Sequence, residues 1–291
     1  MNPQGAASDL AGRFGLRKRA RSWVGDCPSC SYRAAFSIKA GRNGIPFLYC
    51  ANGCTRYQLQ NTASQALGSA WKPSPAPASE LTATAQALKA AAAERLWNGS
   101  TPCGGTPAAR YLERRGIGHA SRSASLRFRG DCGHPEGGRH PALIARVQDA
   151  VGKPIAVHRT YLTPNGRKAT LDPPKASLGP VWGGAIRLHP VAPWLVIAEG
   201  IETAASAGVL LRLPAWAALS AGNLKAGMML PPEVASVTIA ADRDGPGLQA
   251  AQEAARRWRA EGRKVQVMAP DGPGQDFNDL LLCRTGLTHA E

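Results

Sequence analysis

Two short apolar runs in the last third of the chain each end in an acidic residue. Residues 195–198 precede Glu199, and residues 237–241 precede Asp242. Short apolar runs bounded by turn residues are typical of buried strands. In an α/β sheet, the carboxyl ends of parallel strands face the crevice where ligands bind. We therefore expect these two carboxylates to lie at one edge of a buried, mostly parallel sheet.

The two acids belong to a series of three acidic motifs. Glu199 is followed by glycine, Asp242 and Asp244 form an Asp-x-Asp pair, and Asp276 and Asp279 flank Phe-Asn near the C-terminus. Each motif alone is also compatible with an ordinary turn. Carboxylates that converge repel one another unless a cation lies among them, and hard oxygen ligands favour Mg²⁺ or Mn²⁺. The three motifs in this order therefore favour a metal site.

The order of these motifs resembles the TOPRIM domain of primases, topoisomerases and some nucleases, over residues 194–282. The resemblance implies that Glu199, Asp242 and Asp244 bind Mg²⁺ or Mn²⁺. It also implies that Asp276 and Asp279 form the trailing acidic motif of the catalytic centre.

The chain departs from the pattern of replicative primases at two positions. Asn278 stands inside the third motif, which reads Asp-x-Asp-Glu in those enzymes. Glu202 lies three residues after Glu199, where those enzymes place a second acid four residues on. We interpret Glu202 as an acid that favours the positive end of a helix dipole.

The C-terminal third alternates between strand and helix patterns, which predicts an α/β domain with right-handed crossovers. Strands are expected at 194–198, 215–220, 237–241 and 264–268, and helices at 201–213, 247–261 and from 276 to 282.

Four of the seven cysteines form a cluster near the N-terminus. Cys27 and Cys30 are separated by 19 residues from Cys50 and Cys54, giving C-x₂-C-x₁₉-C-x₃-C. A redox C-x-x-C would need a thioredoxin-like βαβ context, which is absent. Each cysteine pair can offer two thiolates from one tight turn, and a hairpin with strands at 34–38 and 46–49 and a turn at 41–44 would join the two pairs. Four thiolates brought together in this way suit structural Zn²⁺. The pattern resembles the N-terminal zinc-binding domain of primases.

The net charge of +15 is unevenly distributed. Residues 1–190 contain 26 Lys and Arg against 9 Asp and Glu, whereas residues 191–291 contain 9 against 11. A basic excess of this size predicts a polyanionic partner, most simply nucleic acid. The alternative is a solubilising basic surface.

The middle of the chain has an antiparallel pattern. Residues 140–147 and 154–162 predict a hairpin with a turn at 149–152. The region resembles the basic subdomain that precedes TOPRIM in bacterial replicative primases, and this implies that Arg159 and Lys175 face the nucleotide and the template. Charge alone adds Arg146, Arg167 and Lys168 as candidates for nucleotide or DNA binding.

We predict four segments: a small β zinc ribbon at 1–68, a Pro- and Ser-rich linker at 69–80, a helical and basic α+β subdomain at 81–190, and a TOPRIM α/β domain at 191–291. Helices are expected at 82–97 and 106–115. No apolar run approaches the roughly 20 residues of a bilayer span, and the N-terminus lacks a signal core. With the cysteine cluster, this predicts a cytoplasmic protein that does not bind membranes.

Together the resemblances imply a DNA primase that makes short RNA primers on a single-stranded DNA template from ribonucleoside triphosphates. Its cofactors would be structural Zn²⁺ and catalytic Mg²⁺ or Mn²⁺. The chain has no P-loop motif, so a replicative helicase is a candidate partner, and the layout resembles compact primases of phages, plasmids and other mobile genetic elements. Two alternatives stay open: a TOPRIM nuclease, and a non-catalytic single-stranded nucleic-acid-binding regulator of replication or defence.

Overall fold

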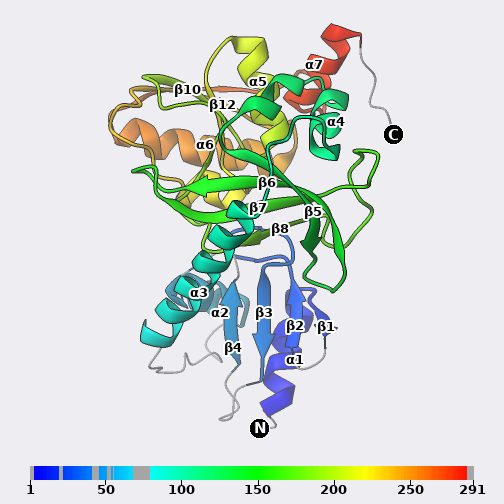
Figure 1. Ribbon diagram of the computed structural model, residues 1–291. Helices are drawn as coiled ribbons and strands as arrows, with labels where there is room; N and C mark the ends of the chain where they lie inside the picture. Colours follow the sequence, from blue (N-terminus) through cyan, green and yellow to red (C-terminus); the bar gives the residue numbers. More distant parts are fainter. Residues whose placement is uncertain are drawn as a thin grey trace. The chain divides into compact units, whose positions relative to one another are not determined.

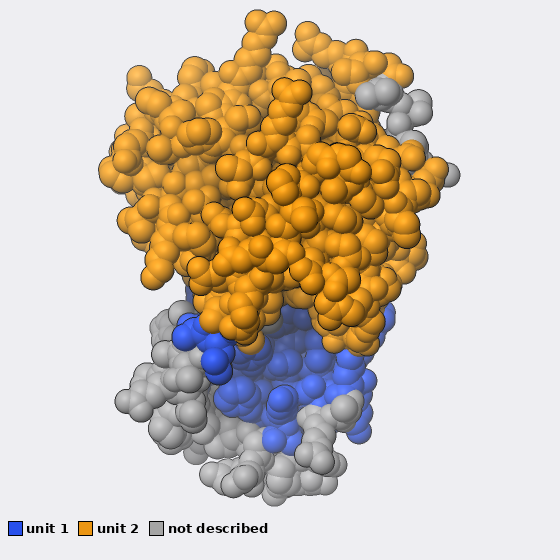
Figure 2. Space-filling model, in the orientation of Figure 1, with its two compact units in different colours: residues 1–88 blue, residues 89–291 orange. Residues whose placement is uncertain are grey.

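The computed structural model describes residues 3–19, 22–40, 46–50, 54, 56–67 and 79–286. The chain divides into two compact units, residues 1–88 and 89–291, which Figure 2 shows in separate colours. Most of the predicted linker, residues 69–78, lies outside the described residues. Its last two positions belong to a long helix, α3 (Ser79–Asn98), which starts three residues before the predicted helix.

The first unit contains a four-stranded antiparallel sheet in the order β1-β2-β3-β4. The hairpin predicted between the two cysteine pairs is confirmed, because Phe36 of β3 pairs with Cys50 of β4. Its predicted turn at 41–44 lies outside the described residues. Phe36 is buried and packs edge-to-face on Phe14 at 5.8 Å, whereas Phe47 is 56% exposed. The elements are α1 (Pro3–Arg13), β1 (Arg17–Arg19), β2 (Ser22–Gly25), β3 (Phe36–Lys39), β4 (Phe47–Cys50) and α2 (Arg56–Leu67).

The second unit begins with a helical part and an antiparallel sheet. Thr106 caps helix α4 (Pro107–Arg114) by accepting a hydrogen bond from the amide of Ala108, as the sequence predicts. The predicted hairpin is also confirmed, since β6 and β7 pair antiparallel. The sheet has the order β5-β6-β7-β8, and β5 was not predicted. Its strands are β5 (Leu126–Gly133), β6 (Arg139–Gln148), β7 (Pro154–Tyr161) and β8 (Lys175–Leu178).

The second sheet of this unit confirms the predicted parallel architecture. Its order is β13-β12-β10-β11-β9, and all neighbours are parallel except β9, which is antiparallel to β11. Strands β10 and β13 have the predicted bounds. The elements are β9 (Ile186–Arg187), β10 (Trp194–Ala198), α5 (Ile201–Leu211), β11 (Ala215–Ala217), β12 (Ser236–Ala240), α6 (Gly245–Ala260), β13 (Lys264–Met268) and α7 (Phe277–Thr285).

Helices cover both faces of the parallel sheet (Figure 1). Val196 and Ala198 point to one face and join a core with α5 and α7, whereas Ile197 on the opposite face packs in a core with Trp258 of α6. The first core also contains Tyr111 of α4, so residues of the middle region and of the parallel sheet share one apolar interior. None of the described helices has the combination of length and apolar character that a bilayer crossing requires.

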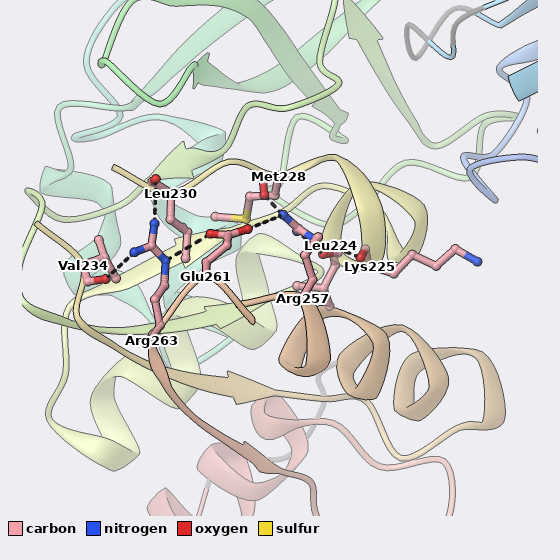
Figure 3. Close-up of polar contacts among 8 residues, drawn as sticks. All are labelled: Leu224, Lys225, Met228, Leu230, Val234, Arg257, Glu261 and Arg263. Atoms are coloured by element: carbon pink, nitrogen blue, oxygen red, sulfur yellow. Dashed lines mark hydrogen bonds and ion pairs between the residues drawn. The ribbon is translucent and has the colours of Figure 1, made fainter. Parts of the chain in front are cut away.

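Two arginines fasten the long connection between β11 and β12 to the end of α6, as Figure 3 shows. Glu261 contacts both guanidinium groups, at 3.5 Å from Arg257 and 3.4 Å from Arg263. The connection includes a π-helical turn at Asn223–Gly227, two of whose carbonyls accept from Arg257. The carbonyls that accept from Arg257 are those of Leu224, Lys225 and Met228, and those that accept from Arg263 are Leu230 and Val234.

We predict that Arg257→Ala destabilises the fold, whereas Arg256→Ala does not. Arg257 is half-buried and serves three carbonyls, while its neighbour Arg256 is exposed on the same helix. Carbonyls left without a donor cost roughly 1–3 kcal/mol, so the free energy of unfolding in urea should fall by about that amount. Equal urea midpoints for the two variants would show that the carbonyl contacts contribute nothing.

Candidate metal centres

The strand register brings the first two acidic motifs to the same edge of the parallel sheet. Ala198 of β10 pairs with Ala240 of β12 on one side and with Ala217 of β11 on the other. Glu199 therefore leaves β10 directly beside the point where the chain runs from Ala240 to Asp242. Since both residues follow the carboxyl ends of adjacent parallel strands, the predicted juxtaposition is confirmed for this pair.

The second acid of the Asp-x-Asp pair faces the start of a helix. Asp244 is the N-cap of α6, and its carboxylate accepts a hydrogen bond of 2.6 Å from the amide of Gly247. A Cβ atom at Gly247 would lie 2.8 Å from this carboxylate oxygen, so glycine permits the close approach. Asp244 is exposed, whereas Asp242 is half-buried.

Backbone pairing brings the third motif alongside the second. The amide of Arg243 donates to the carbonyl of Gln275, and the amide of Gly274 donates to the carbonyl of Arg243, both at 2.9 Å. Asp276 then forms a capping box with Asp279 at the start of α7: its side chain accepts from the amide of Asp279, whose carboxylate accepts from the amide of Asp276, again at 2.9 Å each. These two acids thus have a structural task, and their catalytic role stays a prediction.

The acids at this edge oppose one another's ionisation. Burial, followed by the charge of Asp242, raises the pKa of Glu199 to about 7. Burial, followed by the charge of Asp276, raises the pKa of Asp242 to about 6. The pKa of Asp276 is also raised, mainly by burial. A bound cation would favour the ionised form of all three groups.

The acids are not gathered tightly enough to surround one ion by themselves. Among the described residues, the cysteine cluster is the only group of three or more ligand side chains that lie within coordination distance of one another. The carboxylate of Asp244 accepts from the first turn of α6. Mg²⁺ usually keeps several waters and takes one or two carboxylates, so the Glu199–Asp242 pair fits this ion, and a larger ligand set stays a prediction.

A partly buried ion pair adjoins the acids. Glu202, in the first turn of α5, accepts hydrogen bonds from Lys175 Nζ at 3.0 Å on each carboxylate oxygen and from the hydroxyl of Tyr111 on Oε1. Burial alone would raise the pKa of Glu202, but the charge of Lys175 and the hydroxyl of Tyr111 outweigh it and hold the pKa below its usual value. The sequence interpretation of Glu202 as a helix-dipole residue therefore missed its main contacts.

A signal for Glu202 does exist in the sequence. Helix α5 reads IETAASAGVLL and is buried from Ile201 to Gly208. An acid in a helix that is apolar all round must have a partner, because an unpaired buried charge is very costly. The next residue, Thr203, was also missed; its hydroxyl lies 3.3 Å from Asp242 Oδ1 and donates to it.

Asn278, the departure inside the third motif, is fully buried and structural. Its side-chain amide donates to the carbonyl of Arg115 at 2.7 Å and to Ser206 Oγ at 2.9 Å. It therefore joins α7 to α5 and to the end of α4, a role that a carboxylate could not fill because it has no N–H to donate.

Two of the five predicted basic residues contact uncharged groups of the protein. The guanidinium of Arg159 donates to three backbone carbonyls, those of Gly133, Ala176 and Ser177. That of Arg146 lies over the ring of Trp97, 4.1 Å from its centroid, and burial lowers its pKa.

The other three candidates differ from these in position. Arg167 and Lys168 are exposed in the turn after β7, where the amide of Arg167 donates to Thr163 Oγ1 at 3.0 Å. Lys175 reaches the acidic edge of the sheet through Glu202. Nucleotide or DNA binding by all five residues stays a prediction.

The four predicted zinc ligands lie together in the first unit. Cys27, Cys30, Cys50 and Cys54 are buried, and their sulfur atoms all lie within 4.8 Å of one another. The Sγ–Sγ distance is 3.8 Å for Cys27 and Cys54 and 3.7 Å for Cys30 and Cys50. With Zn–S bonds of about 2.3 Å, a tetrahedral site has sulfurs about 3.8 Å apart. The cluster therefore fits a closed structural zinc site.

Comparison with known proteins identifies the C-terminal region. Residues 194–286 match the model of the Toprim domain, which confirms the resemblance inferred from the three acidic motifs. Residues 87–188 match a model described as a domain of unknown function, DUF7146. A search of curated proteins found no match.

Three solved structures similar to this chain come from primases. A DNA primase domain from Pseudomonas aeruginosa is 18% identical, with 68% of this chain and 74% of that chain covered and a TM-score of 0.44. The zinc-binding and RNA polymerase domains of the Aquifex aeolicus primase are 13% identical, with 98% of this chain and 82% of that chain covered and a TM-score of 0.48. The primase fragment of the bacteriophage T7 primase-helicase protein is 16% identical, with 92% of this chain and 96% of that chain covered and a TM-score of 0.42.

We predict about one zinc ion per chain, held by the cysteine cluster. Cys27→Ser should lower the zinc content and unfold the surrounding sheet, because a hydroxyl is a poor substitute for a thiolate ligand. Elemental analysis and circular dichroism of the purified variant measure both effects. Cys283→Ser, at an exposed position of α7, is the matched control and should keep the zinc; a zinc-free, folded wild-type chain would contradict the assignment.

We also predict a pH signature of the crowded acids. The raised pKa of Glu199 means that the folded state keeps a proton that the unfolded state releases, so its stabilising contribution is present below pH 4.5 and is lost as pH rises through about 7. Without added divalent cation, Glu199→Gln should therefore gain stability relative to the wild type between these pH values. Urea unfolding at both ends of the window measures this difference, and Mg²⁺ should reduce it at the upper end.

Proposed function

We propose that the chain is a DNA primase, which makes short RNA primers on single-stranded DNA by metal-dependent nucleotidyl transfer. The observation that carries the proposal is the pair Glu199 and Asp242. Both lie within the range that matches the Toprim domain, at the ends of adjacent parallel strands, with pKa values raised by burial and by neighbouring carboxylates. Acids with perturbed pKa values at such a crevice are typical of functional sites.

The residues divide the chemistry between them. Glu199 and Asp242, with Asp244 exposed beside them, would hold Mg²⁺ or Mn²⁺; when bound, the ion supplies positive charge that favours deprotonation of the primer 3′-hydroxyl and stabilises the leaving pyrophosphate. Thr203 fixes one oxygen of Asp242. Lys175 would bind the triphosphate of the incoming ribonucleotide, because its ammonium lies near enough to lower the pKa of Glu199.

The first unit supports a primase over the two alternatives. A Toprim nuclease would use the same acids, but the four-cysteine sheet resembles the zinc-binding domain of primases and would hold the DNA template. The basic excess in residues 1–190 suits the phosphate backbone of single-stranded DNA. A binding regulator without activity would have no need for the acidic pair at the strand ends. A replicative helicase is the further partner that this function implies.

Asp242→Asn tests the proposal. The substitution keeps the size of the side chain but removes a charge that a hard dication requires. Primer synthesis on single-stranded DNA with labelled ribonucleotides and Mg²⁺ should fall by roughly a hundredfold or more, while DNA binding should hold or tighten slightly. Asp271→Asn, at an exposed acid before the third motif, is the control and should keep activity.

The same assay separates the alternatives. Shortened template in place of primers would indicate a nuclease, and retention of DNA without any product would indicate a binding protein. Full primer synthesis by Asp242→Asn at ordinary Mg²⁺ concentration would mean that the Asp-x-Asp segment is only a turn.

A further inference from the structure

The buried carboxylate of Glu202 gathers groups from three elements of the second unit. Lys175 comes from β8, Tyr111 from α4 and Glu202 itself from α5. Both carboxylate oxygens accept from the lysine ammonium at 3.0 Å, and the tyrosine hydroxyl donates to Oε1. The contacts join a region that matches a domain of unknown function to one that matches the Toprim domain.

The exposure of the pair is unequal. The side chain of Lys175 is 30% exposed, whereas that of Glu202 is 11% exposed. A lysine ammonium has three N–H donors, and the carboxylate of Glu202 cannot occupy all of them from one side. Glu202 therefore fixes the side chain of Lys175 while part of that side chain stays accessible to a ligand.

The ion pair also adjoins the acidic edge of the sheet. Thr203, the residue after Glu202, donates to Asp242 Oδ1 at 3.3 Å. The charges of Lys175 and Glu202 accordingly act on the pKa values of Glu199 and Asp242. A free lysine side chain is long and flexible, and its ordering costs conformational entropy on binding. A lysine already fixed by Glu202 avoids most of that cost.

Tyr111 completes the arrangement. Its ring is buried in the core that α4 shares with α5 and α7, and its hydroxyl donates to the same oxygen of Glu202 that Lys175 contacts. Because the ring is fixed by packing, the hydroxyl sets the rotation of the carboxylate and so the place of the ammonium. His158, which also faces the pair, is buried and bonded to Ser177 Oγ at 3.1 Å.

We propose that Glu202 and Tyr111 are positioning residues that hold the ammonium of Lys175 beside Glu199, ready to bind a phosphate oxygen of a nucleoside triphosphate. The identity of the ligand rests on the proposed function. The competing explanation is a structural ion pair that only fastens α4, α5 and β8 together. The two explanations differ in what happens to nucleotide affinity when the tyrosine hydroxyl is removed.

The test is equilibrium binding of α,β-methylene-ATP, which cannot be transferred, to the full chain with Mg²⁺ and single-stranded DNA. Lys175→Met keeps the length of the side chain and should weaken binding about tenfold or more, as expected for a lost contact to a charged group. Tyr111→Phe removes one hydroxyl and should weaken binding about fivefold.

Tyr161→Phe is the matched control. Tyr161 is also buried in the second unit, and its hydroxyl donates to the carbonyl of Gly133 at 2.8 Å. Both tyrosine variants should lose thermal stability, but Tyr161→Phe should bind the nucleotide like the wild type. If Tyr111→Phe loses stability and keeps wild-type affinity, the ion pair is structural and the inference is wrong.

The outcomes separate this inference from the proposed function. A chain that binds the nucleotide through Lys175 and Tyr111 but makes no primers contradicts the primase and leaves the positioning role standing. A chain that makes primers while both variants keep wild-type affinity overturns the positioning role alone. Lack of binding by the wild-type chain overturns it as well. If Lys175→Met does not fold because Glu202 is left unpaired, Tyr111→Phe decides the question.

Discussion

Negative charge held at the carboxyl ends of parallel strands is the constraint on which the second unit depends. The acids at these strand ends differ in how far the protein compensates their charge. Glu202 receives an ammonium and a hydroxyl from inside the protein, and its pKa is lowered. Glu199 and Asp242 receive no comparable compensation, and the pKa of each is raised. An acid whose charge is balanced internally supports the structure, whereas the unbalanced acids are those to which the proposed function assigns a cation.

Helix caps and backbone hydrogen bonds also fix the positions of the acidic motifs. Asp244 and Asp276 each cap a helix, so the orientation of both carboxylates is tied to the first turns of α6 and α7. The amide and carbonyl of Arg243 hold the third motif against the second. The capping contacts use some of the oxygen lone pairs, and carboxylates have others to offer. Helix capping and ion binding are thus compatible at the same residue.

Much of this could be read from the sequence, because its signals are local. Apolar runs ending in acids gave β10 and β12, and cysteine spacing gave the cluster in the first unit. Strand β11 ends at Ala217, short of its predicted end, and the chain turns at Leu219, which has a φ of 73°. Strand β5 escaped prediction because charged residues and two glycines interrupt its apolar pattern.

The site was harder to predict because its contacts join distant parts of the chain. Tyr111 lies 91 positions from Glu202, and no local sequence pattern predicts a contact over that separation. Charge alone likewise cannot distinguish Arg159, whose donors are occupied by backbone carbonyls, from Lys175, which reaches the acids. The sequence shows an excess of basic residues, but only the fold shows which of their side chains reach the acidic site.

The ion pair between Lys175 and Glu202 also bears on how such a chain can evolve. The two matched family regions meet near residue 190 in the sequence, yet their residues share one core and one partly buried salt bridge. Recombination at that point would pair an acid from one parent with whatever residue the other supplies, and an unpaired buried charge is strongly destabilising. The middle region and the Toprim region are therefore expected to be inherited together, although each is recognised separately.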